Sequence, residues 1–310
     1  MLKKIIFMGT PLFAVPILKV LYQNGYPISV VYTQPPQKSQ RGQKINKSPI
    51  QGISETLKIE YRTPNSLKNN KEEYNYLKEL DADIAIVVAY GQIIPKEYLS
   101  LVKKGFINIH ASLLPKWRGA APIQRSIMNL EKETGVSIMK IGEKLDTGPI
   151  CNSYKIEITG NDNAKTISEK LSALAAEKIL NNLDDILDDK IQFKEQNHNE
   201  ASYAIKIEKT EGQIIWNETA ENIIGKINGL YPSPGAFFIH KGERYKILKA
   251  KLSLTSGKIG EVLDNYLEIS CGNKKSIKIL EIQRQGKRPQ NISEFMLGSQ
   301  IKKGSNLNNA

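Results

Sequence analysis

The sequence predicts a doubly wound, mostly parallel α/β domain followed by a small β-barrel domain. In the N-terminal part, short apolar runs alternate with segments of helical periodicity, which is typical of parallel strands joined by crossover helices. After a polar stretch near residue 190, short strands recur at regular spacing with turn signals between them, which indicates a small barrel. With 310 residues, the chain is long enough for two such domains.

The first strand, the first helix and the second strand form one predicted βαβ unit. Residues 4–8 are apolar enough for a buried strand, and a tight turn after them leads into a helix. Thr10 is expected to cap that helix, and Pro11 is expected to occupy its first position. The helix should end at Asn24, ahead of a strand at residues 28–32. A strand, a helix and a strand at this spacing imply a parallel sheet.

Further elements follow along the first domain. The run at residues 84–89 is apolar on both faces and predicts a central strand, and residues 106–110 predict another strand. Helical spacing of apolar residues predicts helices at residues 122–130 and 166–187.

After the second of these helices, the sequence becomes polar and weakly patterned, and short predicted strands separated by turn signals follow. We therefore expect a first domain at residues 1–187, a linker at 188–205 and a second, basic domain at 206–310. Five short strands are predicted in the second domain, at residues 236–240, 244–249, 260–263, 266–270 and 276–282. The polar tail from Gly298 is expected to be frayed.

Two polar side chains stand where the strand at residues 106–110 gives way to a loop. Residues i and i+2 of a strand project to the same side, so Asn108 and His110 should point together. An amide donor beside an imidazole suits a carbonyl oxygen that briefly carries negative charge. Asp146, in a separate Asp-Thr-Gly turn, could hold that imidazole and complete a proton-handling set. The alternatives are that Asn108 and His110 only satisfy each other and that Asp146 makes a local turn hydrogen bond.

Composition argues against several kinds of site. The two cysteines lie far apart in the sequence, so neither a disulfide framework nor a zinc site is expected, and a reducing compartment is the default. The glycine fingerprints of dinucleotide and nucleoside triphosphate sites are missing. No apolar stretch is long enough to span a bilayer, so we expect a cytoplasmic protein with no membrane partner.

The charge of the chain points to a polyanionic partner. The formal net charge is +12, which favours nucleic acid first and a membrane surface second. From Ile207 onward there are 16 Lys and Arg against 10 Asp and Glu, so positive charge is denser towards the C-terminus. A basic five-stranded barrel is a common platform for oligonucleotides. A compositional drift towards lysine would give the same surplus without any function.

Several motifs of this sequence occur together in one protein family. They are Phe7-Met8-Gly9-Thr10-Pro11, Thr33-Gln34-Pro35, Val88-Ala89-Tyr90-Gly91-Gln92-Ile93-Ile94-Pro95, Asn108-Ile109-His110, Ser112-Leu113-Leu114-Pro115, Trp117-Arg118-Gly119-Ala120-Ala121-Pro122-Ile123 and Leu145-Asp146-Thr147-Gly148. In these motifs the chain resembles the methionyl-tRNA formyltransferases, a branch of the folate-dependent formyltransferases, over almost its whole length. The resemblance implies a doubly wound α/β formyltransferase domain followed by an OB-like β-barrel.

The resemblance also implies formyl transfer from 10-formyltetrahydrofolate to the α-amino group of methionyl initiator tRNA, with no metal required. Asn108 is expected to bind the oxyanion, and His110 to donate to the same oxygen or to shuttle the proton. Asp146 is expected to orient His110, to favour its charged form and to help accept the amine proton. The basic barrel would bind the tRNA, and we expect a monomer.

One segment corresponds to the folate-binding region of the family, the loop Ser112, Leu113, Leu114 and Pro115. The strand end Val88, Ala89, Tyr90 and Gly91 is expected to lie next to it and to join in binding the folate. Together these segments can offer backbone groups and apolar faces to a pteridine.

The polar loop at residues 37–48 corresponds to the family loop that contacts the acceptor end of tRNA. Its candidate contacts are Lys38, Arg41 and Lys44, and arginine in particular suits phosphates and stacked bases. This sequence has Gln-Lys-Ser-Gln at residues 37–40, where the family often has Arg-Pro-Ala-Gly, so fewer fixed cationic contacts are expected. The alternative is a solvated charged loop.

Four other functions share part of this pattern. A formyltransferase acting on a small amine, or a formyltetrahydrofolate hydrolase, could use the same Asn108, His110 and Asp146. The basic second domain and the polar loop at residues 37–48 argue against both. A non-catalytic RNA-binding protein is disfavoured by the intact polar set, and a nicotinamide dehydrogenase by the missing glycine fingerprint.

Overall fold

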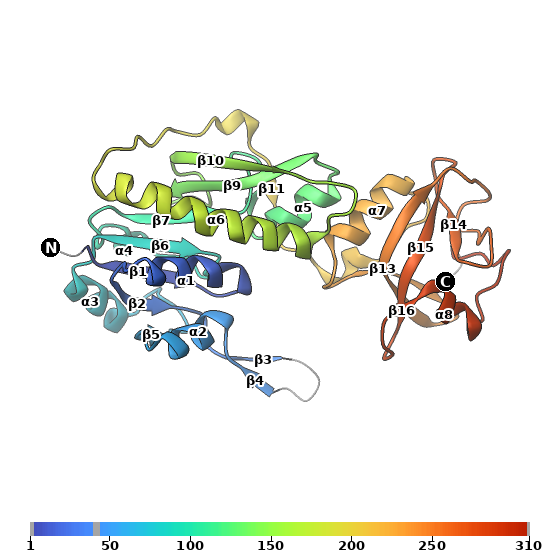
Figure 1. The fold of residues 1–310 in the computed structure, drawn as a ribbon, viewed down its shortest axis with the longest axis horizontal. Helices are drawn as coiled ribbons and strands as arrows, with labels where there is room; N and C mark the ends of the chain where they lie inside the picture. The colour runs from blue at the N-terminus through green and yellow to red at the C-terminus, as the bar shows by residue number, and fades with distance from the viewer. Residues whose placement is uncertain (1–2, 40–43, 309–310) are drawn as a thin grey trace. The chain divides into compact units, whose positions relative to one another are not determined.

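The structure is a computed structural model that describes residues 3–39 and 44–308 (Figure 1). Its internal contacts divide the chain into two compact units. Unit 1 comprises Met1–Gly119, Gly135–Ile156 and Ser168–Tyr203, and unit 2 comprises Ala120–Thr134, Glu157–Ile167 and Ala204–Ala310. Unit 2 thus takes in two segments that precede the predicted linker, and the limits of the functional domains remain a prediction.

Unit 1 is built on a seven-stranded sheet with the order β10-β9-β7-β6-β1-β2-β5. The five strands from β7 to β5 pair in parallel, and β9 pairs antiparallel with β7. Strands β9 and β10 extend the sheet beyond β7 and are not predicted from the sequence. The strands are β1 (Ile5–Gly9), β2 (Ile28–Tyr32), β5 (Tyr61–Arg62), β6 (Ile84–Val88), β7 (Phe106–His110), β9 (Glu133–Lys140) and β10 (Ile150–Glu157).

Helices pack on both faces of this sheet. On one face, Met8 and Tyr32 share a buried cluster with Leu77 of α3 and Tyr98 of α4. The intervening strand residues point to the opposite face, where Figure 1 shows α1 and α6. The helices are η1 (Leu12–Ala14), α1 (Val15–Gln23), α2 (Pro49–Leu57), α3 (Lys71–Leu80), α4 (Lys96–Leu99) and α6 (Ala164–Leu187). Within the two described ranges, no helix of the chain combines the length and the apolar character needed to cross a membrane.

The entry to the first helix differs from the prediction. Thr10 does not cap it, because its hydroxyl donates instead to the carbonyl of Tyr90 at 2.7 Å. This bond forms because β1 and β6 run side by side, so the loops at their carboxyl ends meet. The chain then passes through η1, and α1 begins at Val15 with Pro16, not Pro11, in its first turn. The predicted end of the helix at Asn24 is confirmed.

Unit 2 is built on a five-stranded antiparallel sheet. Strands β12, β13, β15 and β14 follow one another, and β16 pairs with β15. These strands are β12 (Ala236–His240), β13 (Glu243–Ser253), β14 (Glu268–Ser270), β15 (Ser276–Arg284) and β16 (Gln290–Asn291), with helices α5 (Pro122–Met128), η3 (Lys209–Gly212), α7 (Ala220–Gly229) and α8 (Ile292–Leu297). The predicted fold class is confirmed, since a mostly parallel sheet comes first and a domain of short antiparallel strands follows.

Five short elements complete the description. Strand β8 (Arg118–Gly119) pairs with β11 (Tyr203–Ala204), and β3 (Gln37–Ser39) pairs with β4 (Lys44–Asn46). The 3-10 helix η2 (His198–Glu200) lies in the stretch predicted to be a linker.

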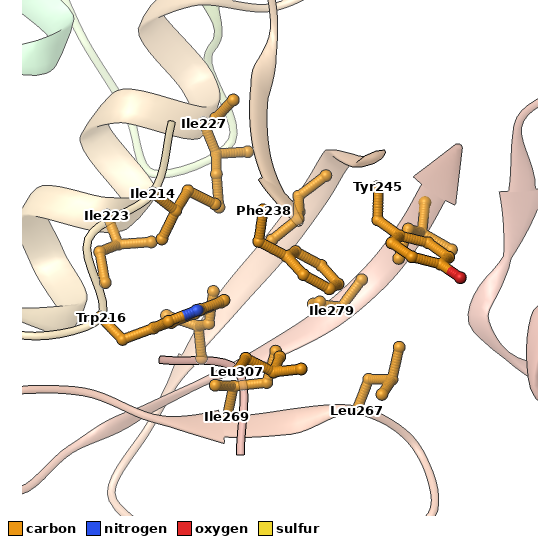
Figure 2. Close-up of a cluster of buried hydrophobic side chains, with 14 of the residues drawn as sticks. Ile214, Trp216, Ile223, Ile227, Phe238, Tyr245, Leu267, Ile269, Ile279 and Leu307 are labelled. Carbon is orange, nitrogen blue, oxygen red and sulfur yellow. The ribbon is translucent and has the colours of Figure 1, made fainter. Parts of the chain in front are cut away.

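The core of unit 2 is a cluster of apolar side chains around three aromatic rings (Figure 2). The ring centroid of Phe238 lies 5.9 Å from that of Trp216 and 5.3 Å from that of Tyr245. Ile301 and Leu307 are buried in the same cluster. The prediction of a frayed tail from Gly298 is therefore wrong through residue 308, because these two apolar side chains anchor the segment.

The predicted strand at residues 260–263 is also wrong. It forms only isolated bridges, at Glu261 with Asn306 and at Val262 with Ile269. Its backbone is used by the C-terminal segment, since the amide of Val262 donates to the carbonyl of Ser305 at 2.9 Å.

A buried carboxylate in unit 2 makes stability depend on pH. Glu268 on β14 accepts a hydrogen bond from Ser276 Oγ at 2.6 Å and pairs with Lys278 Nζ at 3.2 Å. Burial raises the pKa of this carboxyl, but the hydrogen bonds that it accepts outweigh burial and lower the pKa from 4.5 to about 2. The ionised form therefore stabilises the fold above about pH 4.5, and this stabilisation is lost as the pH falls towards 2.

Glu268→Gln should therefore lower the free energy of unfolding at about pH 7, and its difference from the unchanged protein should shrink at about pH 3. Urea unfolding followed by circular dichroism measures both values. Glu294→Gln, at an exposed position on α8, is the control and should change little at either pH. A deficit for Glu268→Gln that is equally large at both pH values would contradict the prediction.

Candidate active site

Strand β7 brings two polar side chains to the carboxyl edge of the parallel sheet. Asn108 is partly buried, and His110 is only 6% exposed. In register, Asn108 lies beside Val87 of β6 and His110 beside Ser137 of β9, so the site is held between neighbouring strands. Ligands of open α/β sheets bind at this edge.

The structure brings Asp146 to both of these side chains. Asn108 Nδ2 lies 3.5 Å from Asp146 Oδ1, and His110 Nδ1 lies 3.7 Å from Asp146 Oδ2. The first distance is a long hydrogen bond, and the second is an electrostatic contact beyond hydrogen-bond range. Asn108 and His110 therefore do not simply satisfy each other, which was one of the two structural alternatives.

Asp146 is also tied to a third segment. Its Oδ2 accepts a hydrogen bond from the amide of Gly119 at 2.8 Å, so the carboxylate bonds outside its own turn. The backbone of Asp146 is left-handed, with φ +49°, which is uncommon for a residue other than glycine. Gly148 is required here, because a Cβ on it would lie 2.0 Å from the carbonyl oxygen of Lys140. The turn is thus packed tightly against the end of β9.

The second ring nitrogen of His110 has its own partner. His110 Nε2 lies 2.9 Å from the carbonyl oxygen of Trp117. A carbonyl oxygen only accepts, so Nε2 must carry a hydrogen in every protonation state that keeps this bond. Nδ1 is then the nitrogen that gains or loses the proton, and it is the one that faces Asp146.

The loop Ser112, Leu113, Leu114 and Pro115 follows directly after β7. Ser137 of β9 fixes its backbone, since its hydroxyl donates to the carbonyl of Ser112 at 2.8 Å and accepts from the amide of Leu114 at 3.0 Å. Leu113 lies over Gly135, where a Cβ would come within 2.4 Å of Leu113 Cδ2. Leu114 is buried, whereas Leu113 and Pro115 are partly exposed and can contribute apolar surface to a ligand.

The strand end Val88, Ala89, Tyr90 and Gly91 follows β6. Ala89 and Gly91 are exposed and have positive φ values of +46° and +81°. The side chains of Val88 and Tyr90 are buried, so at the surface these two residues can offer only backbone groups. The loop is anchored by the segment that follows β2, since Gln34 Nε2 donates to the carbonyl of Gly91 at 2.9 Å.

Two short strands of the candidate tRNA loop pair antiparallel with each other. The backbones of Lys38 and Lys44 lie in β3 and β4, where Ser39 pairs with Lys44. Arg41 lies outside the described residues. The next cation along the chain, Lys47, pairs with Glu55 at 2.9 Å.

Two residues that were not predicted as site residues hold the backbone of the turn that carries Asp146. Arg118 is 2% exposed, and its Nε and Nη2 both donate to Gln196 Oε1. Gln196 in turn donates to the carbonyl oxygens of Asp146 and Gly148. Arg118 belongs to the family motif at residues 117–123, whereas Gln196 lies in the polar stretch predicted to be a linker, where no motif marks it.

Metal-binding geometry is a separate question. Over residues 3–39 and 44–308, no three or more His, Cys, Asp and Glu side chains gather as a group that could hold a metal ion.

Comparison with known families and proteins gives a consistent result. A family model described as Formyl transferase matches residues 3–183, and one described as Formyl transferase, C-terminal domain, matches residues 206–300. The methionyl-tRNA formyltransferase of Pelagibacter ubique (strain HTCC1062) is 74% identical over 309 residues and covers 100% of both chains. That of Jannaschia sp. (strain CCS1) is 40% identical over 304 residues, covering 98% of this chain and 99% of the relative.

Solved structures with the same fold are more distant in sequence. WlaRD, a sugar 3N-formyl transferase crystallised with dTDP and 5-N-formyl-THF, has a TM-score of 0.70 at 22% identity and covers 93% of this chain and 100% of its own. HypX from Aquifex aeolicus, crystallised with tetrahydrofolic acid, has a TM-score of 0.64 at 16% identity and covers 98% of this chain and 49% of its own. The two matching family models and the full-length relatives establish that the chain belongs to the methionyl-tRNA formyltransferase family.

Proposed function

We propose that the protein transfers the formyl group of 10-formyltetrahydrofolate to the α-amino group of methionyl initiator tRNA, for translation initiation in the cytoplasm. The observation that carries the proposal is the meeting of Asn108, His110 and Asp146 at one edge of the sheet in a chain of this family. Both the folate and the tRNA are substrates, so the site has to bind them and stabilise the charge that develops between them.

Asn108 is proposed to stabilise the oxyanion. When the amine nitrogen bonds to the formyl carbon, the carbonyl π electrons move to the formyl oxygen and give it negative charge. The amide of Asn108 carries two hydrogens, and its long contact with Asp146 uses one of them. The other can be donated to the oxyanion, where a fixed donor is most effective.

His110 and Asp146 are proposed to handle the proton. The attacking amine becomes positively charged and must lose a proton, and the N10 atom of the folate must gain one as its bond to the formyl carbon breaks. Because Nε2 is held by the carbonyl of Trp117, the proton is proposed to pass through Nδ1 of His110. The carboxylate of Asp146 lies 3.7 Å from Nδ1 and so faces the nitrogen through which the proton is proposed to pass.

The folate is proposed to lie between the loop at residues 112–115 and the strand end at residues 88–91. Leu113 and Pro115 provide partly exposed apolar surface, and Ala89 and Gly91 provide exposed backbone. This combination suits a flat pteridine with polar edges. A metal is not part of the proposed mechanism.

The tRNA is proposed to contact two regions, the loop at residues 37–48 with Lys38, Arg41 and Lys44, and a basic face of unit 2. On that face Arg244 and Lys246 stand at alternate positions of β13, beside Ile239 and Phe237 of β12. The guanidinium of Arg244 lies 3.6 Å from the centroid of the Phe237 ring. Burial, and next the charge of Arg244, lower the pKa of Lys246. Two cations held together against their repulsion favour an anionic partner such as a phosphate.

Labelled formyl from 10-formyltetrahydrofolate should appear on methionyl initiator tRNA, whereas free methionine and elongator methionyl-tRNA should stay unlabelled. This assay tests the function itself. Consumption of the folate without labelled tRNA would contradict the proposal and would point to a hydrolase or to an enzyme that formylates a small amine. The control reaction contains folate and protein without any acceptor.

Asn108→Ala, His110→Ala and Asp146→Asn should each lower kcat, for Asn108→Ala by about 10²- to 10³-fold, while the Kd for the folate changes less than about threefold. Turnover of labelled tRNA and folate binding by fluorescence titration measure the two effects. His240→Asn, a replacement at a partly buried histidine of unit 2, should leave both unchanged. If a variant lost folate affinity as strongly as turnover, its residue would be a binding residue and the assigned role would be wrong.

Arg244→Gln combined with Lys246→Gln should raise KM for the tRNA about tenfold and leave kcat and the folate KM nearly unchanged. Each lost phosphate contact should also reduce the salt dependence of tRNA binding by roughly 0.7–0.9 in the log–log slope. Lys302→Gln with Lys303→Gln removes the same charge at two exposed positions and is the matched control. Equal effects from the two pairs would mean that only net charge matters, which would contradict a contact at β13.

A further inference from the structure

The side chain of Gln196 bridges the two ends of the catalytic turn. Its Nε2 donates to the carbonyl oxygen of Asp146 at 2.9 Å and to that of Gly148 at 2.8 Å. Gln196 is 7% exposed, so these bonds are largely shielded from water. Both hydrogens of its amide are therefore committed to the turn that carries the proposed proton-handling carboxylate.

The orientation of this amide is set by Arg118. The guanidinium donates to Gln196 Oε1 through Nε at 3.1 Å and through Nη2 at 2.7 Å. A guanidinium has no acceptor, so the atom of Gln196 that faces it must be the oxygen, and the NH2 group must face the turn. Arg118 thus removes the usual ambiguity of a glutamine amide.

Arg118 itself is an unusual support. It is 2% exposed, and its described partners are neutral acceptors, namely Gln196 Oε1 and His198 Nδ1 at 2.9 Å. A buried cation that is held by neutral groups polarises them strongly. By drawing electron density to Oε1 of Gln196, it makes the two N–H groups better donors to the turn.

The bonds close into a ring around Asp146. The residue after Arg118, Gly119, donates its amide to Asp146 Oδ2 at 2.8 Å. Gln196 donates a hydrogen bond to the backbone carbonyl of the same Asp146, whose φ of +49° is left-handed. Such a backbone persists where the surroundings hold it in place. One segment thus fixes the carboxylate directly and fixes the backbone through Gln196.

We propose that Gln196, oriented by Arg118, is a positioning residue that holds Asp146 at the reacting distance from Asn108 and His110. It touches neither substrate and acts only through the Asp146 turn. This inference rests on the proposed role of Asp146 in formyl transfer. Glutamine is required because no other side chain of this length offers one oxygen to the guanidinium and two N–H donors to carbonyls.

Two variants separate these properties. Gln196→Glu keeps the length and the pairing with Arg118, but its ionised carboxylate cannot donate to the two carbonyls and repels them. Gln196→Met keeps only the volume. Asn197→Ala is the matched control, because the side chain of Asn197 bonds only to Asn199 and Glu200. We expect Gln196→Glu and Gln196→Met to lower kcat about 30-fold while KM for both substrates stays within about threefold, and we expect Asn197→Ala to match the unchanged protein.

A double-mutant cycle with Asp146→Asn provides the decisive comparison. If Gln196 acts only through the carboxylate of Asp146, either Gln196 variant should cost less than about threefold in kcat once Asp146 is already Asn. A merely structural residue would cost the same factor in both backgrounds. Single-turnover transfer of labelled formyl gives the four rates, and thermal unfolding confirms that each variant is folded.

Equal losses in the two backgrounds, or near-normal turnover of Gln196→Glu, would overturn the proposal. If Gln196→Met does not fold, Gln196→Glu, which keeps the pairing with Arg118, carries the cycle alone. Near-normal turnover of Asp146→Asn by itself would instead overturn the proposed role of Asp146, and this outcome is recognised before any Gln196 variant is measured. The two failures are therefore distinguishable.

Discussion

The carboxylate of Asp146 is the constraint on which the rest of the site depends. One side chain receives the amide of Gly119, lies at 3.5 Å from Asn108 and faces His110 at 3.7 Å. It therefore joins the end of β7, the segment after it and a turn nearly forty residues further on. The carbonyl of Trp117 holds the other nitrogen of His110, so the imidazole is hydrogen-bonded on one side and faces the carboxylate on the other. This arrangement leaves Nδ1 as the ring nitrogen of His110 that can exchange a proton.

Much of the fold could be predicted from local patterns. The apolar runs of β2, β7 and β12 match the predicted bounds, because a strand buried on a face must be apolar there. Strands β9 and β10 were not predicted, since polar residues such as Asn152 interrupt β10, and pairing with a neighbour is what makes it a strand. The polar composition of the tail after Gly298 predicts fraying, but two apolar side chains are enough to anchor it.

Some features of the site could also be predicted from local patterns, and others could not. The i and i+2 spacing predicts that Asn108 and His110 point together, and this follows from strand geometry alone. That Asp146 joins them was only one possibility from the residue types, and the family resemblance favoured it over a local turn, because no local rule links residues so far apart in the chain. The pairing of Arg118 with Gln196 could not be predicted, since a buried guanidinium–amide pair leaves no periodic signal.

Locating the hydrogen on the neutral ring of His110 tests most directly whether Nδ1 is the nitrogen that exchanges the proton. Long-range ¹H–¹⁵N correlation spectra of protein labelled with ¹⁵N-histidine distinguish the two neutral ring forms, and the loss of one signal set in His110→Asn assigns the residue among only three histidines. We expect neutral His110 to carry its hydrogen on Nε2 and to take up a second proton at Nδ1. A neutral form with the hydrogen on Nδ1 would contradict the account, because Nε2 could then not donate to Trp117 and the proposed path of the proton would be closed.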